Sequence, residues 1–132
     1  MRKVLYSIFS LVLFVSCSNK EVEDNSEVKD NSLEGEWVLN NVACFCGFGQ
    51  DYDFSSSTIT FNTAENKITI ENNGEFQFLR ESGTYSYSGK DNTLEFDNGN
   101  SYIFEIDGAD LRLIFEDEPN IADDEITFYY SR

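Results

Sequence analysis

The sequence contains no histidine at all. This absence removes the usual general base, the commonest ligand of transition metals and every Ser-His or Cys-His nucleophile arrangement. An enzyme would have to rely on carboxylates, tyrosine or lysine. We therefore predict a protein that is not an enzyme and that holds no metal or cofactor.

Basic residues are scarce, with nine Lys and Arg against 25 Asp and Glu. Only seven of the nine follow position 17, whereas all 25 acidic residues do, so the chain beyond that position carries a formal charge of −18. It has no basic patch. We predict that it does not bind nucleic acid and that bare anionic lipid repels it.

Helical periodicity is also missing after the N-terminus, and the chain has a single proline. The 12 Phe and seven Tyr, together with short clusters of Gly, Asn, Asp and Ser, favour strands and turns. With 132 residues there is room for one domain with one small core. The composition therefore predicts an all-β domain.

No apolar run is long enough to cross a membrane as a helix. The longest runs from Val4 to Val15, follows Arg2 and Lys3, and precedes polar chain. This order is typical of a secretory signal peptide, which we assign to residues 1–16.

The residues Phe14-Val15-Ser16 before Cys17 resemble the lipobox of bacterial lipoproteins. The resemblance implies that Cys17 becomes the lipid-bearing N-terminus and anchors the protein to a membrane of the cell envelope, first of all the outer membrane. The alternative is an ordinary signal cleaved nearby, with Cys17 a bystander.

The polar stretch over residues 17–33 predicts a flexible acidic tether. Its acidic residues resemble an export signal for the outer face of the outer membrane, against the alternative of a plain solvated spacer.

Apolar and polar residues alternate from Gly35 onward, in short runs between turn residues. Asn-Gly at 73–74 and 98–99 and Asp-Gly at 107–108 predict tight hairpins, so consecutive strands are antiparallel. The apolar positions that we place on one face are Trp37, Leu39, Ala43 and Phe45; Ile59 and Phe61; Ile68 and Ile70; Phe76 and Phe78; Tyr85 and Tyr87; Leu94 and Phe96; Tyr102, Phe104 and Ile106; Leu111, Leu113 and Phe115; Ile126, Phe128 and Tyr130.

These runs number nine, but an antiparallel sheet closes on itself only with an even number of strands. We interpret the run from Phe76 to Leu79 as an irregular continuation of its neighbour. The prediction for residues 34–132 is a small antiparallel up-and-down barrel of about eight strands, closed so that no sheet edge is exposed.

Gly35-Glu36-Trp37 at the head of the first strand resembles the Gly-x-Trp motif of lipocalins, and the chain is similar to the lipocalin-like domains of bacterial lipoproteins. The resemblance implies that Trp37 packs under an Arg from a late strand. Arg132 shares the parity of the last inward set, and we expect it to stack on Trp37 at the closed end of the barrel.

The interior of the predicted barrel is apolar, either as a filled core or as a slot for a ligand at the open end. A slot is expected opposite Trp37, under the long loop from Gly47 to Ser57. The loop residues that would line this mouth are Phe48, Asp51, Tyr52 and Asp53.

Acidic clusters at 51–53, 116–118 and 123–125 either hold Ca²⁺ or are solvated loops. No EF-hand spacing is present, which favours solvated loops. The strand carboxylates fall on the outward parity or in turns, where a glycosidase-like acid and base pair would not face each other. They are Glu71, Glu75, Glu95, Asp97 and Glu105.

Cysteine is limited to three residues, so Cys44 and Cys46 are the two thiols left if Cys17 is lipidated. Two sulfurs without imidazole make a poor zinc site, and Cys-x-Cys is not the redox motif Cys-x-x-Cys. In an oxidising compartment we favour a disulfide within the loop, with free thiols as the alternative.

Two functions remain open. The first is a lipid-anchored module that binds a small apolar ligand or an envelope protein at the open end. The second is a structural or interaction lipoprotein with a filled core and no small-molecule ligand.

Overall fold

The computed structural model describes residues 32–115 and 125–132 of the chain. The signal peptide, Cys17 and nearly all of the tether lie outside the described residues, as does the chain from 116 to 124. No helix in the described part is long and apolar enough to cross a membrane.

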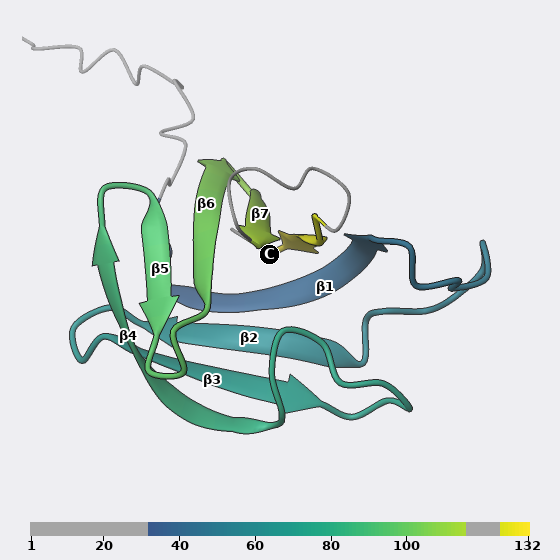
Figure 1. The fold of residues 1–132 in the computed structure, drawn as a ribbon, viewed down its shortest axis with the longest axis horizontal. Helices are drawn as coiled ribbons and strands as arrows, with labels where there is room; N and C mark the ends of the chain where they lie inside the picture. The colour runs from purple at the N-terminus through teal and green to yellow at the C-terminus, as the bar shows by residue number, and fades with distance from the viewer. Residues whose placement is uncertain (1–31, 116–124) are drawn as a thin grey trace, which may run out of the picture.

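Eight antiparallel strands form a closed barrel, since β8 pairs with β7 on one side and with β1 on the other (Figure 1). This confirms the predicted fold class, and the strands are β1 (Gly35–Ala43), β2 (Ser57–Asn62), β3 (Lys67–Asn72), β4 (Gly83–Lys90), β5 (Thr93–Phe96), β6 (Ser101–Asp107), β7 (Asp110–Phe115) and β8 (Thr127–Ser131).

The two ends of the barrel differ in the length of their connections. At one end, here called the closed end, short turns join β2 to β3, β4 to β5 and β6 to β7. Asn66, Asp91 and Gly108 take positive φ angles of 51°, 58° and 64° there. At the other end, the mouth, β1 and β3 run into the long loops 44–56 and 73–82 (Figure 1).

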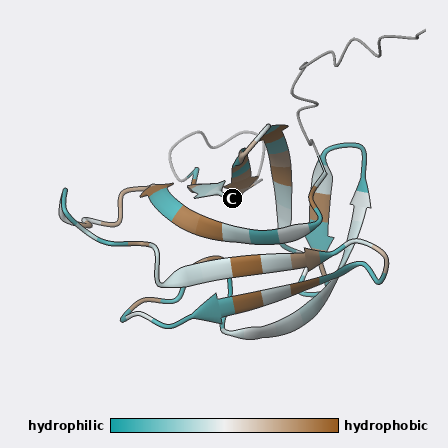
Figure 2. Ribbon diagram, turned by 180° about the vertical axis from the view of Figure 1, so that it is seen from behind, coloured by the Kyte–Doolittle hydropathy of each residue, from teal (hydrophilic) through white to brown (hydrophobic). Residues whose placement is uncertain are grey.

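The inward faces of the strands form one apolar core, and Figure 2 shows the alternation of apolar and polar residues along β1, β2 and β3. Most of the predicted inward residues are buried, which confirms the period of two. They are Trp37, Leu39, Ile59, Phe61, Ile68, Ile70, Phe78, Leu94, Phe96, Tyr102, Leu111, Leu113, Phe128 and Tyr130. Six further residues are partly buried against the core, namely Tyr85, Tyr87, Phe104, Ile106, Phe115 and Ile126. The exceptions are Ala43, Phe45 and Phe76, which are exposed.

Among the described residues, the Tyr130 hydroxyl is the one buried side-chain polar atom without a hydrogen-bond partner. Burial raises the pKa of this hydroxyl. A buried polar atom of this kind costs stability relative to a phenyl ring of the same shape.

The inward assignment at the end of β1 was wrong after Leu39. Leu39 pairs with Tyr130 but Asn41 pairs with Tyr129, so Asn40 is an extra residue in β1. Such a β-bulge reverses the parity of the residues after it. Val42 is therefore buried, while Ala43, predicted inward, is exposed.

Phe45 is corrected for the same reason: it comes after the bulge, lies beyond the end of β1 and is 94% exposed.

The run from Phe76 to Leu79 is neither a strand nor a continuation of one. It belongs to the loop 73–82, and Asn73-Gly74 is the start of that loop rather than the tight hairpin that we predicted. Phe78 is 5% exposed and Phe76 is 42% exposed. Phe78 packs against Phe54 of the loop 44–56.

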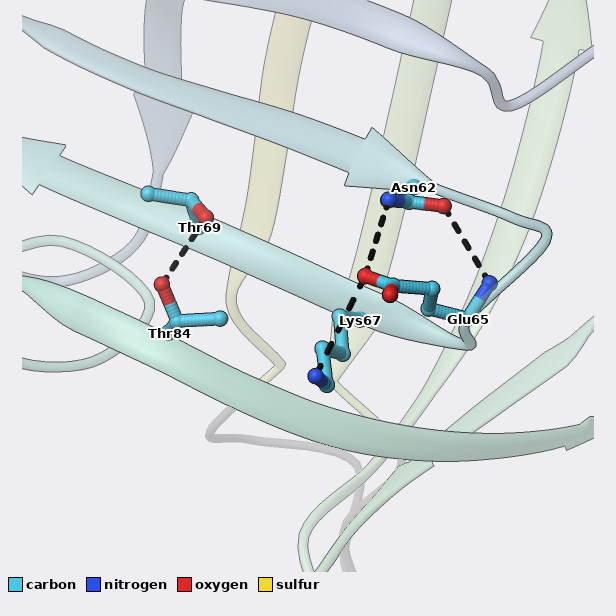
Figure 3. Close-up of polar contacts among 5 residues, drawn as sticks. All are labelled: Asn62, Glu65, Lys67, Thr69 and Thr84. Carbon is cyan, nitrogen blue, oxygen red and sulfur yellow. Dashed lines mark hydrogen bonds and ion pairs between the residues drawn. The ribbon is translucent and has the colours of Figure 1, made fainter.

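Polar side chains lie on the outer side of β2, β3 and β4, as Figure 3 shows for five of them. The side-chain amide nitrogen of Asn62 donates to the Glu65 carboxylate at 3.0 Å across the turn. The backbone N–H of Glu65 donates to the side-chain oxygen of Asn62 at 3.1 Å. The hydroxyls of Thr69 and Thr84 lie 3.0 Å apart on neighbouring strands. The strand and turn carboxylates that we placed outward are all exposed.

Candidate binding site at the mouth of the barrel

Five aromatic rings close one side of the mouth. Phe54 and Phe78 are buried at its centre, with ring centroids 5.4 Å apart. The two long loops contribute the whole set, which we call the aromatic cluster: Phe48, Tyr52, Phe54, Phe76 and Phe78. These rings pack against one another at the loop 44–56, and the slot beneath Gly47 to Ser57 stays a prediction.

Asn72, the last residue of β3, holds the loop 73–82 in place. Its side-chain oxygen accepts hydrogen bonds from the Ser57 hydroxyl at 2.5 Å and the Phe78 N–H at 3.1 Å. Its amide nitrogen donates to the carbonyl of Arg80 at 2.8 Å. The Asn72 side chain thus satisfies backbone groups of the loop that have no partner strand.

The loop makes a tight three-residue turn at Leu79. The N–H of Arg80 donates to the carbonyl of Phe78 at 2.7 Å, and Leu79 has a φ of 64°. A γ-turn with positive φ is the rarer and more strained form, and such strain persists where the surroundings hold it. The turn directs Leu79 toward the core and places Arg80 at the mouth.

A pocket of about 390 Å³ lies at the mouth beside this turn. Its volume falls in the range of small-molecule sites. The apolar residues that line it are Leu79, Tyr102, Phe115, Ile126 and Phe128, and the polar ones are Gln77, Arg80, Glu81 and Asn100. We call it the mouth pocket.

A larger hollow of about 470 Å³ lies over β6, β7 and β8. Two of its apolar members, Leu111 and Tyr130, are almost fully buried, whereas Leu79, Phe115 and Ile126 of the mouth pocket are only partly buried. Its exposed side chains include the ion-paired Glu105 and Arg112. The mouth pocket is therefore the better candidate for an apolar ligand.

Arg80 is fixed on two sides. Its Nη1 donates to Asp97 Oδ1 at 2.6 Å, and its guanidinium carbon lies 3.9 Å from the centroid of the Tyr85 ring. The hydrogen bond from Arg80 lowers the pKa of the Asp97 carboxyl and raises the pKa of the guanidinium. The Tyr85 hydroxyl in turn donates to the carbonyl of Glu81 at 2.8 Å.

The predicted mouth residues of the long loop divide into two pairs. Phe48 and Tyr52 point into the aromatic cluster, with centroids 5.2 Å apart. Asp51 and Asp53 are exposed, and Asp53 accepts the N–H of Ser55 at 2.9 Å. Hydrogen bonds from Ser55 lower the pKa of Asp53.

No three potential metal ligands converge anywhere in residues 32–115 and 125–132. The acidic residues 116–118, 123 and 124 lie outside the described residues.

Cys44 and Cys46 lie at disulfide distance and are joined in the structure, with Cα atoms 5.2 Å apart. This spacing lies inside the usual range for a bridge. Gly47 comes next with a φ of 69°, which lets the chain turn sharply after the bridge. Phe45 between the cysteines points to solvent.

The closed end holds Gly35, Trp37 and Arg132. Gly35 has a φ of 102°, which favours glycine, and Trp37 is fully buried. The Arg132 guanidinium lies 4.3 Å over the indole. The indole N–H donates to the carbonyl of Leu33 at 2.9 Å.

Sequence reasoning missed Leu79 and Arg80, which line the mouth pocket, and Asn72, which holds their loop. Arg80 carries the one visible signal, since it is the single basic residue between Lys67 and Lys90. Asn72 and Leu79 give none, because an Asn at a strand end and a Leu in an apolar run are ordinary.

A family model described as a lipocalin-like domain matches residues 33–113, which run from just before β1 into β7. No curated protein matches the chain.

Proposed function

The chain belongs to the lipocalin-like domain family, and from this premise we propose that it binds a small apolar molecule at the mouth of its barrel without catalysis. The observation that carries the proposal is the mouth pocket, with its apolar floor and polar rim. The inward side chains occupy the barrel interior, so the ligand sits at the mouth rather than deep inside.

The floor of the mouth pocket is aromatic. Tyr102 contacts Phe115 with centroids 5.4 Å apart and Phe128 at 6.4 Å. Tyr102 and Phe128 are almost fully buried and Phe115 is partly buried, so Phe115 is the ring of the three with the most surface open to a further ring. The floor therefore supports a flat apolar ligand.

Native mass spectrometry of the protein purified from its envelope tests this proposal. A small molecule should co-purify with the wild type and be lost from Ile126→Gln, which puts an amide into the pocket. Ile103→Gln is the matched control, because Ile103 is also partly buried but does not line the pocket. A clean apo mass in all three proteins, with no binding of added apolar probes, would refute the proposal.

A protein partner is the second candidate, and Phe45 supports it. This ring is 94% exposed on a three-residue disulfide loop, and Phe76 in the other long mouth loop is 42% exposed. Exposed aromatic residues are frequent in protein interfaces. An envelope protein that cross-links to a photoreactive residue at position 45, together with an apo mass of the wild type in native mass spectrometry, would favour this function.

We further propose that a lipid on Cys17 anchors the domain in the cell envelope, first of all at the outer membrane. The lipobox-like residues before Cys17 support this, and they lie outside the described residues. Residues 18–32, if flexible, would span roughly 20 Å on average. Metabolic labelling with an alkyne fatty acid should mark the wild type and not Cys17→Ser, and equal labelling would refute the anchor.

The tether joins the domain at the closed end of the barrel. Ser32 lies at the closed end, where its carbonyl accepts a hydrogen bond from Arg132 at 3.2 Å. The mouth is at the opposite end of the barrel. An anchor at Cys17 therefore lets the mouth face away from the membrane.

A further inference from the structure

We propose that the mouth pocket selects uncharged apolar molecules and discriminates against organic anions, because Asp97 neutralises Arg80, the one cation among the described residues that line it. This inference rests on the proposed function and names the ligand class of the same site. Its physical basis is the surroundings of Arg80.

Arg80 is the only basic residue of the three described mouth loops, 44–56, 73–82 and 97–100. The same loops carry five carboxylates, namely Asp51, Asp53, Glu75, Glu81 and Asp97. An anion that approaches the mouth therefore meets a negative field. A neutral molecule does not.

Asp97 does not itself line the pocket, but its carboxylate lies beside the guanidinium that the charged head of an anion would contact. Its carboxylate lies 2.6 Å from Arg80 Nη1, and Tyr85 covers one face of the guanidinium at 3.9 Å. A carboxylate or sulfonate bound to Arg80 would stand beside Asp97, and like charges at such a distance repel. It would also come close to Glu81 on the rim.

The guanidinium still has hydrogen bonds to offer. It carries five N–H donors, and within the described residues Nη1 is the nitrogen with a hydrogen-bond partner. The Arg80 side chain is 25% exposed and lines the pocket. A carbonyl, ether, amine or hydroxyl of the ligand can accept from it without adding charge.

The rim adds further neutral polar groups. Asn100 and Gln77, which come from different loops, both line the pocket. The Tyr102 hydroxyl is neutral near pH 7, and burial raises its pKa further. An uncharged flat molecule with one acceptor thus meets apolar rings below and donors at the edge.

Two probes with the same rings test the selectivity. N-Phenyl-1-naphthylamine is neutral, and 8-anilinonaphthalene-1-sulfonate carries a sulfonate on the same skeleton. Both become fluorescent in apolar sites. They are titrated into the purified mature protein, and any signal that persists in Ile126→Gln is subtracted as binding outside the pocket.

The neutral probe should bind at least about tenfold more tightly than the sulfonate, a difference of roughly 1.4 kcal/mol. Added salt should reduce the difference in affinity between the two probes, because it screens the repulsion between the sulfonate and the carboxylates at the mouth. Asp97→Asn should raise the affinity for the sulfonate several-fold and leave that for the neutral probe nearly unchanged. Asp53→Asn is the control, because Asp53 bonds Ser55 in its own loop, and it should alter both affinities little.

The outcomes separate the two proposals. Equal affinities, or tighter binding of the sulfonate, would overturn the selectivity and leave the proposed function standing. No pocket-dependent binding of either probe would overturn the proposed function and this inference with it. The neutral probe also reports whether the Asp97→Asn pocket is folded, and the salt titration of the wild type needs no variant.

Discussion

The guanidinium of Arg132, the last residue of the chain, lies 4.3 Å over the ring of Trp37 in the first strand. Its Nη1 also donates to the carbonyls of Ser32 and Glu34, at 3.2 and 3.1 Å. The contact therefore joins β8, β1 and the segment before β1 at the closed end.

Arg132→Ala should lower the free energy of unfolding by about 1 kcal/mol, since it removes a cation–π contact and hydrogen bonds from a charged donor. Urea denaturation monitored by Trp37 emission measures the change. Arg112→Ala, which removes an exposed ion pair with Glu105, should change stability by less than about 0.5 kcal/mol. Equal effects of the two substitutions would argue against a closing role for Arg132.

The bulge at Asn40 predicts opposite responses at two neighbouring residues. Val42→Asp puts a carboxylate into the core and should destabilise the fold by about 3 kcal/mol or more. Ala43→Asp, on the exposed side, should be nearly neutral. Denaturation midpoints of the two variants measure these effects. A larger loss of stability in Ala43→Asp than in Val42→Asp would mean that β1 has no bulge and that Ala43 faces the core.

Asn72→Ala should destabilise the protein by about 2 kcal/mol, because it leaves the Ser57 hydroxyl and the Phe78 N–H without their acceptor. Hydrogen exchange over 73–82 should rise more than over the strands, since the loop loses its anchor. Asn41→Ala removes an exposed amide of the same size and should leave exchange in this loop as in the wild type. Unchanged exchange in Asn72→Ala would contradict the anchoring role.

Tyr130→Phe should stabilise the protein by up to about 1 kcal/mol, because it removes a buried hydroxyl without a partner in the described part of the chain. Tyr129→Phe removes a hydroxyl from a neighbouring residue that is only partly buried, and it should have almost no effect. Calorimetric melting temperatures compare the two. A loss of stability in Tyr130→Phe would mean that the hydroxyl has a partner.

Stability at low pH should depend on Glu34. Its carboxylate accepts the Thr63 hydroxyl at 2.6 Å and the Thr63 N–H at 2.8 Å, and these bonds lower its pKa in the folded state. A lowered pKa contributes stability above the ordinary Glu value near 4, and this contribution is lost as pH falls through the folded value.

The urea midpoint of Glu34→Gln should therefore lie below that of the wild type near neutral pH and converge with it as pH falls to about 2. Glu36→Gln, at an exposed neighbour, should match the wild type throughout. A gap for Glu34→Gln that is constant with pH would show that the carboxylate charge plays no part.

The sequence by itself determined the barrel. Alternation from Trp37 to Tyr130 assigns the inward face because side chains on a strand repeat every two residues, and this local rule needs no knowledge of partners. Positive-φ residues such as Gly99 and Gly108 mark two of the turns for an equally local reason. The Gly-x-Trp motif and the parity of Arg132 likewise pointed to the closed end.

Only the tertiary structure decided the mouth. The bulge at Asn40 arises from the pairing of β1 with β8 at the far end of the chain, so local alternation predicted Ala43 where Val42 is buried. The loop 73–82 has its shape because Asn72 and the aromatic cluster hold it. The charge of Arg80 is paired by Asp97, and one face of its guanidinium is covered by Tyr85. The distances from Arg80 to these two residues depend on how the whole barrel closes.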